Sequence, residues 1–524
     1  MQEMEKSNSL KQINPIDKTA FIIAFIIINL AFSFHTFNFM FGDHDWTYVR
    51  SPNYWSEGAF EGRPLHFVLL SVLFGGHVVP ILNNLVSFAA LALSGLLLAK
   101  YWRIPQTLLN YTLFAIFPAV LPYTMVWLFY AKDTLINLSL PLIAVTALLI
   151  ADKAQTAKRP WLFHLVAVVL FYFAYASYAA VVNFFGVCFL GHILISYAYS
   201  KESLKNILKQ NLLAVADMLI ALVLFKITLV VFPASDSYNT ELIPLTYLPQ
   251  KVVETLKVMV AQFITPLPFM ELKYKLMLLL LTLFGFALSL KNGGAGRAVM
   301  LVIMAIAVLF ASKLAFFIAE ERGQILAEME NFAFVPRLDF YGLAYVYALG
   351  LALVLLTPYE KLKKLGVILA CVIAFMSIVR DMYVQKVWKL GFDAEMKAHE
   401  RIVTRLEERA DFYPARKYRL LQIGSLSLRE NFYKKAEGEA VSLDLLKTSF
   451  TPQFKSSLVY NFYYPEDVFY ENAPLLSISA KAKQWLKETA RPWPAAESIM
   501  IDGDIIIIVL DEVALNKART QSAN

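Results

Sequence analysis

Stretches of about 20 consecutive apolar residues recur along this chain, and each is long enough to cross the hydrocarbon core of a bilayer as a helix. Hydrophobic residues make up 58% of the 524 residues and charged residues only 17%, which is too apolar for an ordinary soluble protein. The sequence therefore predicts a mainly α, polytopic transmembrane helical bundle. About eleven spans are expected, beginning near Lys18, His77, Pro105, Thr134, Pro160, Ser177, Leu208, Tyr274, Arg297, Phe340 and Leu362.

The organisation of the chain changes after the last apolar run. Residues 1–380 contain the apolar spans, whereas residues 381–524 carry charged, alternating and turn-forming segments that are typical of a folded domain. Residues 418–423 alternate like a strand, and residues 499–510 have the pattern of a hairpin with an Asp-Gly turn. We expect a transmembrane module over 1–380 and a small C-terminal α/β domain over 381–524.

The positive-inside bias orients the spans. Basic residues gather in alternate loops, which places the N-terminus in the cytoplasm and puts the loops around Asp43, Asp133 and residues 233–272 outside. An odd number of spans then makes the domain 381–524 extracytoplasmic. The loop 233–272 is long enough to cover a site on that side or to serve as a surface connection. The basic residues that carry the bias include Lys6, Lys100, Arg103, Lys158, Lys205, Arg297 and Lys363.

The charge pattern and the cysteines exclude several classes of function. The net charge is +7, but the lysines and arginines are spread over short loops and form no basic surface with interleaved aromatic residues. Nucleic acid is therefore not an expected partner. Cys188 and Cys371 both lie inside apolar runs, which offers neither a disulfide framework nor a Cys-x-x-Cys metal spacing.

Two carboxylates follow the first apolar run directly. Asp43 and Asp45 lie where a span ends and water begins, so they can stay ionised while facing a lipid-borne substrate. Arg50 and Arg63 follow them as candidate phosphate partners. The alternative interpretation is a solvated loop, because charged loops commonly flank transmembrane helices.

Transfer of a sugar from a lipid phosphate needs a base for the acceptor hydroxyl and cations for the departing phosphate. Asp43 or Asp45 can be the base, and Arg63, Lys132 and Arg337 are cations at external helix boundaries that can gather on the phosphate. Each of these three cations can instead be an interfacial anchor that extends its charged end toward water.

The order of these features resembles the serotype-converting O-antigen glucosyltransferase family, glucosyl transferase II type, within the GT-C class of polytopic glycosyltransferases. The resemblance rests on an acidic pair followed by Arg, Trp and Gly-Arg-Pro, and on the segment W-L-F-Y-A-K-D-T at 127–134. Weaker similarity extends through most of the membrane portion. The matching residues are Asp43, Asp45, Arg50, Trp55, Gly62, Arg63, Pro64, Lys132 and Asp133.

The resemblance implies a GT-C-like fold and transfer of glucose, with inversion, from a polyprenyl-phosphate donor to an external glycan such as lipid-linked O-antigen. It also implies location in a bacterial inner membrane, with the C-terminal domain periplasmic or extracellular. Arg50 and Asp133 would support the site. His44 separates two acids that are adjacent in the family; it can orient one of them or be an uninvolved loop residue. No cofactor is expected, since nearby cations can neutralise a leaving monophosphate without a divalent metal.

Two other classes of function remain open from the sequence. A transporter or flippase of lipid-linked sugars would share the spans and the external cations, although transporters commonly show paired halves with broken helices, which are not evident here. A noncatalytic scaffold would use its outer domain to bind a partner. Within the apolar runs, Lys313 can reach an interface, whereas Asp217 has no partner that the sequence identifies.

Overall fold

The structure is a computed structural model that describes most of the chain. The described residues are 14–38, 40, 45, 52, 55–233, 241–242, 245–264, 270–291, 294–320, 339–426, 428, 456–464 and 466–522. The chain divides into two compact units, one formed by Met1–Phe39 with Pro52–Tyr383 and the other by Met40–Ser51 with Val384–Asn524. It is mainly helical, as predicted, with a small sheet.

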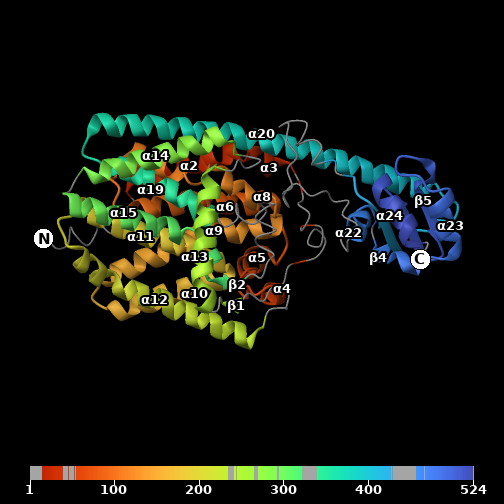
Figure 1. Cartoon of the computed structure of the whole chain (residues 1–524), viewed down its shortest axis with the longest axis horizontal. Coiled ribbons are helices and arrows are strands. Elements are labelled where there is room, and N and C mark those ends of the chain that lie inside the picture. The colour runs from red at the N-terminus through yellow and green to blue at the C-terminus, as the bar shows by residue number, and fades with distance from the viewer. Residues whose placement is uncertain are drawn as a thin grey trace. The chain divides into compact units, whose positions relative to one another are not determined.

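Long helices running side by side make up most of the first unit (Figure 1). Several begin at a proline, which is well suited to the first helical turn because its missing N–H needs no partner there. The helices are α2 Pro15–Ala31, α3 Ser33–Phe37, α4 Trp55–Phe60, α5 Val68–Phe74, α6 Pro80–Tyr101, α7 Leu108–Ile116, α8 Met125–Leu128, α9 Ala131–Ala154, α10 Pro160–Ser177, α11 Val182–Tyr199, α12 Leu204–Val231, α13 Leu248–Ile264, α14 Leu272–Leu290, α15 Ala295–Ala311, α16 Leu314–Ile318, α19 Leu343–Leu356 and α20 Glu360–Glu407.

Within the described residues, eight helices are long and apolar enough to cross a membrane. They correspond to eight of the segments expected to span. The remaining three form shorter helices, α2 and α15 with 17 residues each and α7 with nine. α7 stops at Ile116, two residues before Pro118, which has no backbone N–H to continue the helical hydrogen bonds.

The segment after α7 is broken but buried. The 3₁₀ turn η2 (Pro122–Thr124) and the short helix α8 lead to α9, and Phe117–Tyr130 are buried throughout. Irregular backbone at membrane depth is tolerated only where protein covers it. This break brings the residues before α9 into the interior of the bundle.

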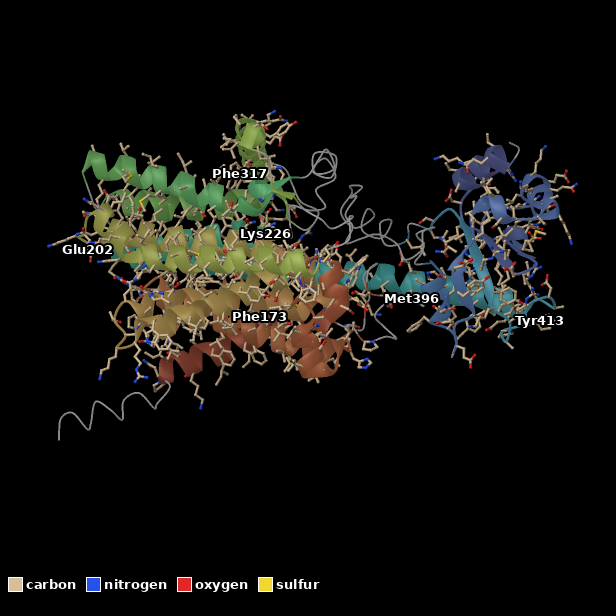
Figure 2. The ribbon with its side chains drawn as sticks, turned by 90° about the horizontal axis from the view of Figure 1, so that it is seen from below. Phe173, Glu202, Lys226, Phe317, Met396 and Tyr413 are labelled. Atoms are coloured by element: carbon tan, nitrogen blue, oxygen red, sulfur yellow. The ribbon has the colours of Figure 1, made fainter. Side chains whose placement is uncertain are left out.

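The 233–272 loop contains a helix of its own. α13 follows the 3₁₀ turn η4 (Leu245–Tyr247) and runs across the long helices in Figure 1, where it packs on α14, α15 and α16. The short strand β1 (Glu241–Leu242) pairs with β2 (Ala319–Glu320) in antiparallel register. Figure 2 shows Glu202, just before α12, at one end of the bundle, with Lys226 further along that helix.

The second unit is built on a four-stranded mixed sheet in the order β4-β3-β6-β5. The strands are β3 Tyr418–Ile423, β4 Phe469–Asn472, β5 Ile499–Asp502 and β6 Ile505–Val509. Strand β3 is parallel to both β4 and β6, whereas β5 and β6 form an antiparallel hairpin that turns through Gly503 at φ +65°. The strand expected at 418–423 and the hairpin expected at 499–510 are therefore present.

Helices cover both faces of this sheet. One hydrophobic cluster joins β3 and β6 to the C-terminal part of α20 and to α22 (Ser456–Asn461), and the other joins the same strands to α23 (Ala480–Glu488) and α24 (Glu512–Ser522). All five residues of β6 are buried, as expected for a strand covered on both sides. The second unit begins at Val384 within α20, and the sequence places a domain boundary before Asp381.

We predict that Gly350→Ala destabilises the first unit. A Cβ atom at Gly350 would lie 2.5 Å from Thr282 Cα, and one at Gly285 would lie 2.2 Å from Gly350 O, because α14 and α19 approach closely through small residues. Overpacking of this kind costs about 1–3 kcal/mol of unfolding free energy. Gly296→Ala is the matched control, since nothing lies within 4 Å of its added Cβ. Equal midpoints for the two variants in unfolding experiments in detergent would contradict this packing.

Candidate functional site

The residues singled out from the sequence fall into two groups. Asp43, His44, Arg50 and Arg337 lie outside the described residues. Asp45 is described, is 2% exposed and belongs to the second unit. Arg63, Lys132 and Asp133 lie in the first unit, where the structure brings them together with three residues that the sequence analysis did not select: Glu57, Glu61 and His66. We call these six residues the Arg63–Lys132 cluster.

A glycine turn at the end of α4 places Glu61 and Arg63. Gly62 has φ +72°, the left-handed conformation that glycine adopts without steric cost. The Arg63 amide donates to Gly58 O at 2.7 Å and the Gly62 amide to Ala59 O at 3.0 Å, which is the paired hydrogen-bond pattern of a Schellman C-cap. The Gly-Arg-Pro motif is therefore a helix stop that positions charged residues on both sides of one glycine.

The residues after Arg63 complete the end of α10. The Leu65 amide donates to Ala176 O at 3.0 Å, and the His66 ring nitrogen Nδ1 lies 2.8 Å from Ser177 O. These contacts satisfy carbonyls of the last turn of α10, which have no partner within the helix. His66 is completely buried there.

His66 also contacts the first turn of α9. Its Nε2 atom lies 2.9 Å from Asp133 Oδ1. The Ser177 carbonyl can only accept, so Nδ1 carries a hydrogen, and the Nε2–Oδ1 contact then needs a second hydrogen on one of its two atoms. The hydrogen-bond network therefore assigns this pair one proton more than a neutral imidazole and a carboxylate would hold.

Glu61 bridges the two cations of the cluster. Its Oε1 atom lies 3.2 Å from Lys132 Nζ, and its Oε2 atom lies 3.4 Å from Arg63 Nη1. The Lys132 side chain is 8% exposed and that of Arg63 is 24% exposed. Lys132 is thus a buried ion-pair partner rather than an anchor extended into water, and Arg63 is only partly open to solvent.

Aromatic side chains line the same region. The Arg63 guanidinium lies over the Tyr178 ring, 4.8 Å from its centroid, a favourable cation–π contact. Tyr178 packs edge-on against Trp127, with ring centroids 5.3 Å apart, and Trp127 also contacts Tyr341. Trp127 comes from the buried break before α9. The broken helix therefore contributes an aromatic wall next to the cations.

Glu57 is the third carboxylate of the cluster. Burial raises the pKa of its carboxyl above the usual range; Lys132 opposes this shift and the charge of Glu61 adds to it. Its Oε2 atom is buried and receives no hydrogen bond from the described residues. Glu57 therefore takes up a proton more readily than an exposed glutamate.

Two residues of the cluster are of the type that binds anions, although the cluster also contains three carboxylates. Lys132 and Arg63 are two adjacent cations with limited solvent, and arginine and lysine are the usual partners of phosphate oxygens. Among the described residues there is no group of three or more histidines, cysteines, aspartates or glutamates arranged to hold a metal ion.

Two other charged pairs lie within the apolar part of the first unit. Lys313 is 1% exposed and forms an ion pair with Asp339, so it does not reach an interface as the sequence suggested. The Oδ2 atom of Asp217 lies 2.7 Å from His164 Nδ1. His164 is therefore the partner of Asp217 that could not be identified from the sequence.

Glu57, Glu61 and His66 were not selected from the sequence, because the sequence patterns around them are only weakly informative. Glu57 and Glu61 are four residues apart, the spacing that places two side chains on one face of a helix. His66 stands alone in an apolar segment, a pattern that also fits a core histidine.

No protein-family model, curated protein or solved structure matches this chain.

We predict that Asp133→Ala lowers the free energy of unfolding by about 3–5 kcal/mol, because it leaves a buried partner of an ion pair uncompensated. Asp133→Asn should cost much less, since the amide can donate to a neutral His66 ring. The measurement is chemical unfolding in detergent. Asp152→Ala, at the half-buried other end of α9, is the control. Equal losses for the alanine and asparagine variants would show that the His66 contact does not determine stability.

Proposed function

We propose that this protein is a membrane glycosyltransferase that moves a sugar, glucose by the family resemblance, from a polyprenyl-phosphate donor to an extracytoplasmic glycan such as O-antigen. The observation that supports the proposal best is the convergence of Arg63 and Lys132 beside an aromatic wall in a membrane protein. The two cations come from separate segments of the chain, both of which belong to the motifs that resemble the family.

The proposed reaction is a single inverting displacement. A carboxylate, Asp43 or Asp45, removes the proton from an acceptor hydroxyl, whose oxygen attacks the anomeric carbon. The bond from that carbon to the phosphate oxygen breaks, and the phosphate leaves with the electron pair. Arg63 and Lys132 stabilise the negative charge that grows on the phosphate, and Arg337 is a third proposed partner. Arg50, Asp133 and His44 are proposed as supporting residues.

The proposal also includes the topology of the chain in the membrane. It comprises about eleven spans, a cytoplasmic N-terminus and an external C-terminal domain in a bacterial inner membrane. The eight long apolar helices and the charge bias of the loops support it. The location of the proposed base on the external side would give it access to a glycan acceptor.

Transport of a lipid-linked sugar is the second candidate. The buried pair Lys313–Asp339 and the partly buried pair His164–Asp217 favour it, because ionisable residues within membrane segments often mark a pathway for ions or substrates. Mass analysis of surface glycans from cells with and without the protein separates the two functions. A hexose increment that depends on the protein supports transfer, whereas unchanged glycans with accumulated lipid intermediate support transport.

We predict that Asp43→Asn and Asp45→Asn have unequal effects on transfer. Loss of the general base should lower the rate by about 100- to 10,000-fold, and loss of a supporting carboxylate should lower it less. We favour Asp43 as the base. The measurement is sugar transfer by purified protein from a polyprenyl-phosphate donor. Transfer at the original rate by both variants would remove these carboxylates from the mechanism.

We predict that Arg63→Ala lowers turnover by about 100-fold or more, because it removes a donor that stabilises the leaving phosphate. Arg63→Lys should recover only part of the loss, since an ammonium group lacks the planar fork of guanidinium. Turnover and unfolding are measured on the same preparations. Full activity of the folded lysine and alanine variants would identify Arg63 as an anchor without a role in catalysis.

A further inference from the structure

The Glu61 carboxylate contacts both cations of the Arg63–Lys132 cluster. Its two carboxylate oxygens are divided between the two cations, one on Lys132 at 3.2 Å and the other on Arg63 at 3.4 Å. The phosphate of a polyprenyl-phosphate sugar, which is a diester, would offer its two terminal oxygens to the same two cations in a similar way. The Glu61 carboxylate therefore occupies the place where the proposed function requires the donor phosphate.

The lengths of the two Glu61 contacts indicate that another anion can replace its carboxylate. Charge-assisted hydrogen bonds between such groups are commonly about 2.7–2.9 Å long, so both contacts of Glu61 are long. The donor is a phosphodiester, so it offers two terminal oxygens and one negative charge, as a carboxylate does. The polyprenyl monophosphate that leaves has a third terminal oxygen and a further negative charge, which allows it to bind both cations at shorter distances. Glu61 directly follows the last residue of α4 and precedes Gly62, and its side chain has three rotatable bonds through which its carboxylate can move away from the cations.

The surroundings of Glu61 also favour exchange. Glu57 is a neighbouring carboxylate, and its charge interaction with Glu61 is repulsive. Lys132 is nearly buried, and the negative charge of Glu61 lowers the cost of keeping its ammonium group out of water. Glu61 thus keeps the two cations paired before the ligand arrives, and a phosphate that enters can take over both contacts.

We propose that Glu61 is an internal substitute for the donor phosphate and that phosphate binding displaces its carboxylate from Arg63 and Lys132. The inference rests on the proposed function, because it takes the phosphate of that donor as the ligand. It makes Glu61 a specificity-determining residue: only a ligand whose binding outweighs the two contacts of the Glu61 carboxylate can enter.

Binding of farnesyl phosphate, a prenyl monophosphate without a sugar, tests the inference. The full chain in detergent is titrated by calorimetry, and unfolding of each variant is measured in parallel. Glu61→Gln should bind the probe about tenfold more tightly than the unchanged protein, because the competing charge is gone. Adding Arg63→Ala to this variant should remove the gain. Glu61→Asp, which keeps the charge but is too short to reach both cations, should give an intermediate affinity and serves if Glu61→Gln does not fold.

Two matched variants separate displacement from a general change in charge. Glu57→Gln removes a nearby negative charge without vacating the contacts on the cations, so its gain should be clearly smaller than that of Glu61→Gln. Glu271→Gln removes an exposed glutamate that pairs with Lys273 and should leave affinity unchanged. Equal gains for the Glu57 and Glu61 variants, a weaker affinity for Glu61→Gln, or no binding by any variant would each overturn the inference.

The same preparations are assayed for sugar transfer, which keeps the two proposals distinguishable. Tighter probe binding by Glu61→Gln without any transfer by the unchanged protein would retain the role of Glu61 as a phosphate substitute and overturn glycosyl transfer. Transfer by the unchanged protein without tighter binding by Glu61→Gln would overturn the role of Glu61 alone.

Discussion

The contact between His66 and Asp133 determines the arrangement of the candidate site, because it joins three separate elements at one buried point. His66 Nδ1 holds the last turn of α10 through Ser177, and Nε2 holds the first turn of α9 through Asp133. The negative end of the α10 dipole lies at His66, and the positive end of the α9 dipole lies at Asp133. The α9 dipole therefore favours the Asp133 carboxylate, and the α10 dipole favours a hydrogen-bond donor such as the His66 ring. With these helix ends fixed, Lys132 and Arg63 are brought to the same carboxylate of Glu61.

The sequence predicted the class of fold and part of the site for physical reasons that are easy to name. Apolar runs identify spans because the bilayer requires a minimum helix length, and eight long helices are found in the described part of the chain. Arg63 and Lys132 were selected as cations at predicted external helix boundaries, and Asp133 because it belongs to a segment that resembles the family; the structure brings these three together. Strand β3 and the β5–β6 hairpin were evident from alternation and an Asp-Gly turn, both of which are local signals.

What the sequence did not reveal depends on contacts between distant segments. α4 has only six residues, too few for a periodic pattern to show which face carries Glu57. His66 in an apolar segment fits a packed histidine as well as a site residue, and only its contacts with Ser177 and Asp133 distinguish the two. Lys313 lies near a helix end, so extension toward water was a reasonable expectation, but tertiary packing places Asp339 beside it. The segment before α9 was likewise expected to be an external loop, whereas Phe117–Tyr130 are buried.

A site in which a carboxylate already holds the cations has a cost and a benefit, and both follow from electrostatics. The cost is affinity, since an incoming phosphate must release Glu61 before it binds. The benefit is order: Lys132 and Arg63 stay paired and oriented in a region with little water, so little reorganisation is needed when negative charge develops on a leaving phosphate. Binding energy that is given up in the ground state does not slow the chemical step, provided that the same cations bind the transition state more strongly. The Gly62 turn is what makes this exchange geometrically simple, because it places the carboxylate and one of its two cations on either side of a single residue.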